Sequence, residues 1–175
     1  MKKSHIAQNR HRARELAVQL LYSLGTRPDQ DSEGCVDAFI SDCGFAFEEG
    51  TEVKEYLSFL VNGAWEKRFE IDNMMRMIVT GWRPEHMVAV DRAVLRLALF
   101  EGFLAKKVPI SIAIAEAVEL ACAFGTEDSG KFVNGVLGKM ARSDVSDPNS
   151  VSGSNKTSSK DDENAAAASE ISTDR

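Results

Sequence analysis

Apolar residues recur every three or four positions along most of the first 142 residues, and no stretch alternates for long enough to predict a strand. This period is that of an α-helix with one buried face, so we predict an all-α chain. Helices are expected at residues 10–24, 35–42, 51–78, 94–104 and 110–124, with a last helix that begins at Asp128 or Ser129. Six or seven short helices in about 135 residues favour two small bundles packed together.

Two of these helices have distinctive surfaces. The segment 94–104 is apolar on nearly every side, so it is predicted to be central, with Asp91 as its N-cap. The helix after it is expected to end at Gly125. The last helix should bury one arc of its surface, made of Phe132, Val133, Val136, Leu137 and Met140.

The composition changes at residue 143. From there on Ser, Asp, Asn, Lys and Ala dominate, and acids outnumber the three basic residues. Such a segment cannot bury enough apolar surface to fold, so residues 143–175 are predicted to be a disordered acidic tail. Residues 9–142 are then one folded domain, and residues 1–8 a flexible basic arm.

Charge is distributed unevenly along the chain. The first fourteen residues hold no acid and five bases, which are Lys2, Lys3, Arg10, Arg12 and Arg14. Because the formal net charge of the chain is −6, everything after residue 14 sums to −11. A basic segment that leads into a helix is typical of phosphate binding, since each cation that pairs with a phosphate releases counterions. A solvated N-terminus explains the same charge equally well.

Several classes of protein are disfavoured. No apolar run approaches the roughly 18 residues of a membrane span, and residues 1–14 lack the apolar core of a signal peptide, so a cytoplasmic location is expected. The cysteines are odd in number and lack a C-x-x-C spacing, which predicts reduced, mostly buried thiols at Cys35, Cys43 and Cys122. The scattered histidines His5, His11 and His86 add no metal-site spacing, so neither metal nor cofactor is expected.

Two patterns resemble catalytic motifs without matching them. Residues 125–131 have the opening spacing of a P-loop, but Phe132 replaces the Ser or Thr that binds magnesium, and a helix precedes them where a strand is required. We interpret them as a turn between two helices. Glu116 and Glu119 lie three apart without an accompanying histidine, which favours a solvated face over an acid–base pair. No enzymatic activity is predicted.

Three stretches follow one another as in a known family. They lie at residues 10–23, 82–101 and 108–137, and they contain RHRARELAVQ followed by LYS, WRPEHMVAVDRAVLRLALFE, and IAEAVELA followed by FGTEDSGKFVNGVL. Together they closely resemble the NusB family of bacterial transcription antitermination factors. The resemblance covers residues 8–140.

This resemblance implies an all-helical fold of two perpendicular bundles and a function without catalysis. It also implies that the chain pairs with NusE, a small-subunit ribosomal protein, and that the pair binds single-stranded boxA RNA in ribosomal RNA leader transcripts. The bound pair would then assemble an antitermination complex on RNA polymerase and support rRNA synthesis. Whether the free protein is a monomer or a homodimer stays open.

The family's RNA-binding residues can be carried over position by position. Its arginine-rich segment corresponds here to Arg10, Arg12 and Arg14, in agreement with the charge argument above. His11 stands where the family often has another arginine. Because a histidine is mostly uncharged at neutral pH, RNA affinity at this position should be weaker or pH-dependent.

The turn at residues 125–131 also corresponds to the family's RNA surface. Lys131 is therefore a candidate phosphate contact, Phe124 a stacking partner, and Asp128 a residue that tunes affinity. Each has a structural alternative. Asp128 can serve as a helix cap, and Phe124 and Phe132 are expected in the core rather than in a stacking role.

The family's NusE surface includes an acidic position that matches Asp91, with Tyr22 nearby and Glu85 as a weaker candidate. Asp91 could equally be only an N-cap. The sequence departs from the family pattern at Pro84, which replaces an apolar residue near this surface, at Ala115, which replaces a common Asn, and in its acidic tail.

Two other functions compete with antitermination. One is an RNA methyltransferase with a NusB-like N-terminal domain, which would need a βαβ domain and a Gly-rich cofactor loop that the tail does not offer. The other is a purely protein-binding helical module whose basic arm is incidental. Salt dependence separates the second from RNA binding, because phosphate contacts weaken steeply as salt rises.

Overall fold

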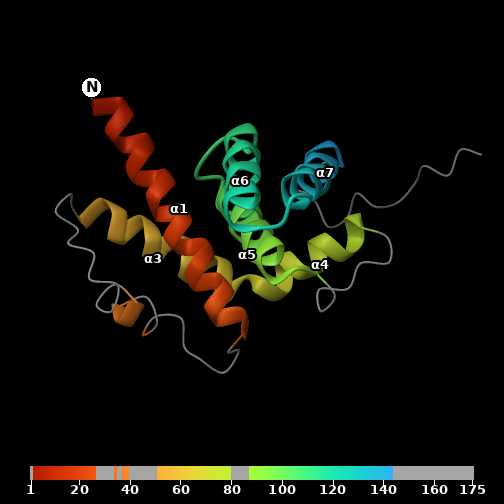
Figure 1. Ribbon diagram of the computed structural model, residues 1–175, viewed down its shortest axis with the longest axis horizontal. Helices are drawn as coiled ribbons and strands as arrows, with labels where there is room; N and C mark the ends of the chain where they lie inside the picture. Colours follow the sequence, from red (N-terminus) through yellow and green to blue (C-terminus); the bar gives the residue numbers. More distant parts are fainter. Residues whose placement is uncertain (1, 27–33, 35–36, 40–50, 80–86, 144–175) are drawn as a thin grey trace, which may run out of the picture.

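The computed structural model describes residues 2–26, 34, 37–39, 51–79 and 87–143, and within these ranges every regular element is a helix. The predicted all-α fold is confirmed. The elements are α1 (Lys2–Thr26), α3 (Thr51–Glu66), α4 (Arg68–Ile78), α5 (Ala89–Ala98), the π-helix η2 (Leu99–Leu104), α6 (Ile110–Phe124) and α7 (Ser129–Arg142), shown in Figure 1.

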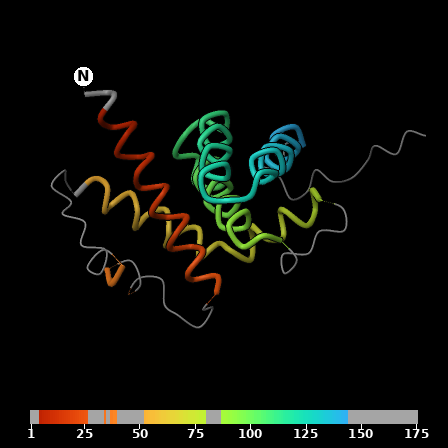
Figure 2. The backbone as a smooth tube through the Cα atoms, viewed as in Figure 1, coloured from red at the N-terminus to blue at the C-terminus, as the bar shows by residue number. Residues whose placement is uncertain are grey.

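The helices form two groups that share a central element. Helix α1 crosses α3 in one group, α6 lies beside α7 in the other, and α5 runs between them (Figure 2). Helix α5 packs against both α1 and α6, so its surface is enclosed on nearly every side. Val94, Leu95 and Leu97 are each almost fully buried, which confirms that this segment is central. No helix in these ranges is long and apolar enough to cross a bilayer.

The central segment differs in detail from its predicted form. It begins at Ala89 with Val88 at the N-cap position, so the assignment of Asp91 as N-cap is wrong. Asp91 lies in the first turn instead, where a carboxylate still interacts favourably with the helix dipole. From Leu99 onward the backbone hydrogen bonds of η2 span five residues instead of four. The amide of Ala105, for example, donates to the carbonyl of Phe100 at 2.8 Å. A π-helical turn of this kind is rare and is often found at functional sites.

Other helix boundaries also differ from the predicted ones. Helix α1 begins at Lys2, so the backbone from residue 2 to 8 continues the helix where we predicted a separate flexible arm. The predicted helix at 51–78 is two helices, interrupted at Lys67. Of the predicted helix at 35–42, only residues 37–39 lie within the described residues, and they are helical. Residues 144–175 of the predicted tail lie outside them.

Helices α6 and α7 pack as a pair, as their apolar periods predict. Val133, Val136, Leu137 and Met140 are buried as expected. The prediction that Phe124 and Phe132 join the core is wrong, because they are 37% and 36% exposed.

These two phenylalanines flank the turn between α6 and α7, at the end of the helix pair, where neither ring is enclosed. Cys122 is likewise exposed rather than buried, while Cys35 and Cys43 lie outside the described residues.

Candidate nucleic-acid interface

The three arginines predicted to bind RNA have different environments on α1. Arg12 is exposed and forms a 2.8 Å ion pair with Glu15, one turn along the same helix. Arg10 is half-buried, and its guanidinium carbon lies 5.3 Å from the centroid of the Tyr56 ring. Arg14 is only 3% exposed. The three arginines therefore have three different environments, although they are evenly spaced along the helix.

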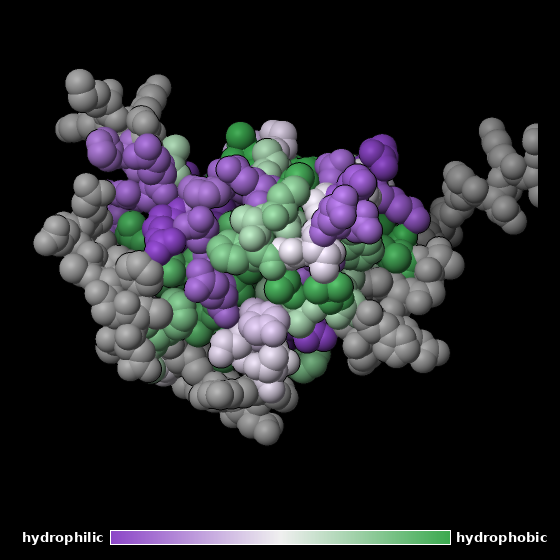
Figure 3. All heavy atoms as spheres, viewed as in Figure 1, coloured by the Kyte–Doolittle hydropathy of each residue, from purple (hydrophilic) through white to green (hydrophobic). Residues whose placement is uncertain are grey.

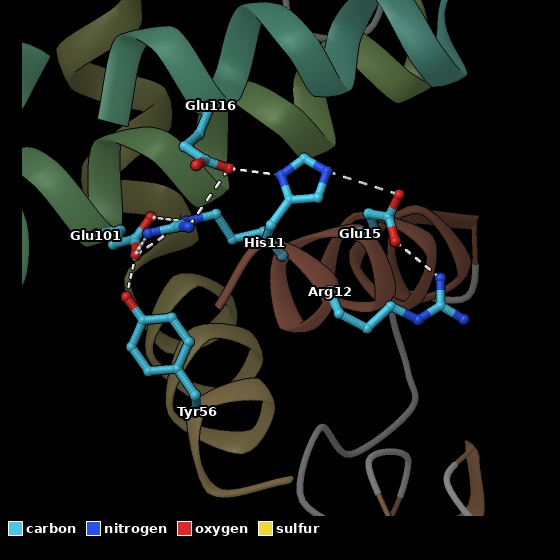
Figure 4. A network of polar contacts seen from close by, with 7 residues as sticks. His11, Arg12, Glu15, Tyr56, Glu101 and Glu116 are labelled. Carbon is cyan, nitrogen blue, oxygen red and sulfur yellow. Dashed lines mark hydrogen bonds and ion pairs between the residues drawn. The ribbon is translucent and has the colours of Figure 1, made fainter. Parts of the chain in front are cut away.

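Arg14 is held by a buried carboxylate from η2. Its Nε donates to Glu101 Oε2 at 2.8 Å and its Nη2 donates to Glu101 Oε1 at 2.7 Å, a bidentate arrangement shown in Figure 4. Glu101 is 1% exposed and also accepts a hydrogen bond from the hydroxyl of Tyr56. With its cation enclosed and neutralised, Arg14 has no surface to offer a phosphate. Its predicted role as an RNA contact is corrected to one of fixing α1 against η2.

This network changes the protonation of its members. Burial alone would lower the pKa of Arg14, but the hydrogen bonds and charge of Glu101 outweigh it and raise that pKa. Burial raises the pKa of the Tyr56 phenol well above its ordinary value, and the hydrogen bond to Glu101 adds to the effect. Arg14 therefore stays charged and Tyr56 stays neutral throughout the physiological range.

His11 connects α1 to α6. Its Nδ1 lies 2.8 Å from Oε2 of Glu116, and its Nε2 lies 3.8 Å from Oε1 of Glu15 (Figure 4). The hydrogen bond to Glu116 raises the pKa of His11 above 6.5, against the lowering effect of partial burial. His11 therefore carries more positive charge near neutral pH than an isolated histidine would.

A histidine lies beside Glu116 and Glu119 of α6, contrary to our interpretation from the sequence. This histidine is His11 of α1. Ligand atoms of His11, Glu116 and Glu119 all lie within 4.8 Å of one another, a grouping that could hold a metal ion. However, Glu116 also lies 3.4 Å from Nη1 of Arg14, and a permanent cation at that distance disfavours a second one. The arrangement is best described as an ion-pair network between α1 and α6.

The turn between α6 and α7 carries the remaining predicted RNA contacts. Lys131 and Asp128 are highly exposed, and Nζ of Lys131 lies 3.7 Å from Oδ1 of Asp128. Asp128 occupies the N-cap position of α7, but its side chain forms no capping hydrogen bond within the described part of the chain. Instead Oγ of Ser129 accepts a 2.9 Å hydrogen bond from the amide of Thr126. The Asp128 side chain therefore contacts Lys131 and does not cap α7.

Hydrophilic side chains cover α1 and α7 on one face of the molecule, with a more apolar strip over α6 between them (Figure 3). Gly125 shapes the turn at the end of this strip, because a Cβ there would lie 2.4 Å from Oγ of Ser129 and 2.6 Å from the carbonyl oxygen of Ala121. The exposed rings of Phe124 and Phe132 flank this turn. The ammonium group of Lys131 and the rings of Phe124 and Phe132 are thus all accessible at the α6–α7 turn.

The residues predicted to meet a protein partner are less uniform. Tyr22 is 44% exposed near the end of α1. Asp91 is 5% exposed, and its Oδ1 accepts no hydrogen bond from any residue that the structure describes. Glu85 lies outside the described residues. The structure therefore presents Tyr22 at the surface and encloses Asp91.

Sequence reasoning missed Tyr56 and Glu101 altogether. A glutamate within a segment that is apolar on nearly every side does carry a signal, because a fully buried carboxylate is almost always paired. Nothing in the sequence identified the partner, since Glu101 and Arg14 are 87 positions apart. The same limit applies to His11 and Glu116, which are 105 positions apart.

Comparisons with known proteins agree with this architecture. The model of the NusB family matches residues 11–142. A transcription antitermination protein NusB from Symbiobacterium thermophilum is 42% identical over 137 residues, which are 77% of this chain and 90% of that protein. One from Herpetosiphon aurantiacus is 46% identical over 132 residues, 73% of this chain and 86% of that protein.

Solved structures share the fold. NusB of T. maritima superposes with a TM-score of 0.68 at 33% identity, covering 76% of this chain and 90% of its own. A NusB chain crystallised with NusE and double-stranded RNA superposes with the same TM-score at 24% identity, covering 77% of this chain and 97% of its own. Because these matches span nearly all of the described helices, the chain belongs to the NusB family of transcription antitermination proteins rather than to a class of enzymes.

Proposed function

We propose that this protein binds boxA RNA of ribosomal RNA leader transcripts together with NusE, and that the pair promotes assembly of an antitermination complex on RNA polymerase. The observation that carries the proposal is the positive charge of the N-terminal segment, because the formal charge of the rest of the chain sums to −11. Within this segment the side chain of Arg12 is exposed. Support also comes from the similar NusB chain crystallised with NusE and double-stranded RNA. Contact with nascent RNA implies a cytoplasmic protein.

In this proposal α1 supplies most of the phosphate contacts. Arg12 and Arg10 reach the RNA backbone from the two edges of the helix, and His11 adds positive charge when it is protonated. Arg14 acts as a positioning residue, because its bidentate pair with Glu101 fixes the rotation of α1 and so the direction in which Arg10 and Arg12 point.

The α6–α7 turn completes the RNA surface. Lys131 binds a phosphate, and the exposed ring of Phe124 stacks on a base. Asp128 tunes affinity in two ways, since it partly neutralises Lys131 at 3.7 Å and repels nearby phosphates. Tyr22 and Glu85 belong to the proposed NusE surface, and the enclosed Asp91 supports that surface from within the fold.

The proposal is tested by fluorescence anisotropy of a boxA RNA and a scrambled RNA, with and without NusE, at two salt concentrations. We expect selective binding that NusE strengthens and salt weakens. Arg12→Gln should reduce the salt slope by about 0.7, the value for one phosphate contact on a single strand. Arg76→Gln, an exposed arginine on α4, is the matched control. Equal affinity for both RNAs, or no binding even with NusE, would contradict the proposal and favour a protein-only module.

A further inference from the structure

A separate hollow lies between α1 and α3. Its volume is about 390 Å³, within the usual range for a small-ligand site. Arg10 of α1 lines one wall, and Tyr56 and Phe59 of α3 line another. We call it the α1–α3 cleft. The RNA contacts proposed above lie outside this cleft, except that Arg10 belongs both to the cleft and to the proposed RNA surface of α1.

The cleft contains a supported aromatic platform. The rings of Tyr56 and Phe59 are stacked, with centroids 6.0 Å apart and planes 23° apart. Phe59 in turn packs on the buried ring of Phe100 at 5.2 Å. The hydroxyl of Tyr56 is held by Glu101, so this ring cannot swing out of place. Because the platform is anchored at both ends, it is preorganised for a flat ligand.

Two cations border the platform. The guanidinium carbon of Arg10 lies 5.3 Å from the centroid of Tyr56, and Nζ of Lys107 lies 5.4 Å from the centroid of Phe59. Lys107 comes from the segment between η2 and α6, where Lys106 has a positive φ of 49°. That conformation is uncommon for a residue with a side chain, and such strained residues cluster at ligand clamps. Both cations are long enough to leave the rings and contact an anion beside them.

Two acids also line the cleft. Glu52 and Glu55 of α3 supply carboxylate oxygens, which accept hydrogen bonds from N–H and O–H groups. The same charges oppose a free phosphate or an acidic peptide. A nucleobase satisfies every element at once, since its face stacks on aromatic rings, its amino and imino groups donate to carboxylates, and its attached phosphates meet the cations at the border.

We propose that the α1–α3 cleft binds one unstacked nucleobase of an RNA strand that also contacts Arg10 and Arg12 of α1. The base lies against Phe59 and Tyr56, and the phosphates on either side of it meet Arg10 and Lys107. This inference rests on the proposed RNA binding and extends the path of the RNA across α1 to α3. Arg10 is the residue through which the two surfaces join.

The test places 2-aminopurine at each position of the boxA RNA in turn, because stacking on an aromatic ring quenches its fluorescence. With the full-length protein and NusE, we expect one position to be quenched in a way that Phe59→Leu abolishes. Phe59→Leu should also weaken binding by about tenfold, as expected for loss of one base–aromatic stack. Phe69→Leu is the matched control, since this exposed phenylalanine lies on α4.

A second variant keeps the inference falsifiable if Phe59→Leu lowers stability. Lys107→Gln changes an exposed side chain, and we expect it to weaken binding and lower the salt slope more than Lys67→Gln, an exposed lysine between α3 and α4. If RNA binds and depends on Arg12 but no 2-aminopurine position responds to either cleft variant, this inference alone is overturned. If the wild-type protein binds no RNA, the proposed function and this inference both fail.

Discussion

Replacing the buried carboxylate of Glu101 with an amide should strongly destabilise the fold. Glu101 receives two Arg14 nitrogens and the Tyr56 hydroxyl. In Glu101→Gln the amide nitrogen is a donor that must face another donor, and the cation of Arg14 stays buried without its anion. Removing one partner of a buried ion pair costs about 3–5 kcal/mol. We expect the lower end, about 3 kcal/mol, because Glu116 lies 3.4 Å from Arg14 and compensates in part.

Urea unfolding followed by circular dichroism measures this loss directly. In a thermal scan the same loss should lower Tm by about 10 °C for a domain of this size. Glu119→Gln, an exposed acid on α6, is the control and should stay within about 0.5 kcal/mol of wild type. The double variant Arg14→Met with Glu101→Met should be more stable than Glu101→Gln, because it leaves no unpaired charge. A loss below about 1 kcal/mol for Glu101→Gln would refute this reasoning. So would a double variant whose loss of stability equals the sum of the losses in Arg14→Met and Glu101→Met alone.

Two further predictions concern packing and pH. In Gly63→Ala the new Cβ would lie 1.9 Å from a ring carbon of the buried Phe100, so thermal melting should show a loss of about 1–3 kcal/mol. Gly135→Ala, where a Cβ meets nothing within 4 Å, should instead be neutral or slightly stabilising, and equal losses would contradict the argument. The contact with Glu116 raises the pKa of His11, so its stabilising effect is complete below pH 6.5 and is lost as pH rises through the raised value. The free energy of unfolding of the wild type in urea should therefore fall toward that of His11→Gln as pH rises above 6.5, by less than about 1 kcal/mol because the pair is partly exposed. Parallel curves for the two proteins would exclude this coupling.

Local patterns predicted the helices better than they predicted helix details. The apolar periods of α6 and α7 follow from one buried face each, and both helices formed where expected. The π-helical turn at Leu99–Leu104 has no such signal, because it changes hydrogen-bond spacing without changing which residues are apolar. Asp91 failed as an N-cap for a related reason, since the helix extends past it to Ala89. Start signals indicate a helix more reliably than its first residue.

The predicted site shows the same limit at the level of single residues. Arg10 and Arg14 lie four apart on one helix and look equivalent in the sequence, yet Arg14 is buried because a carboxylate 87 positions away reaches it. Lys131 and Asp128 are exposed as their turn predicted. The exposure of these two residues could be predicted from their turn, whereas the exposure of Phe124 and Phe132 and the burial of Arg14 depend on how distant helices pack and could not be predicted.

The long sequence separation of these pairs has a consequence for synthesis of the protein. Helix α1 leaves the ribosome before η2 and α6, because the carboxylates that fix its rotation, Glu101 and Glu116, follow Arg14 and His11 by 87 and 105 residues. At roughly 5–20 residues per second, this delay is about 5–20 s. During that time Arg14 lacks both of its carboxylate partners, so the rotation of α1 that they fix, and with it the orientation of Arg10 and Arg12, is set only after α6 has been synthesised.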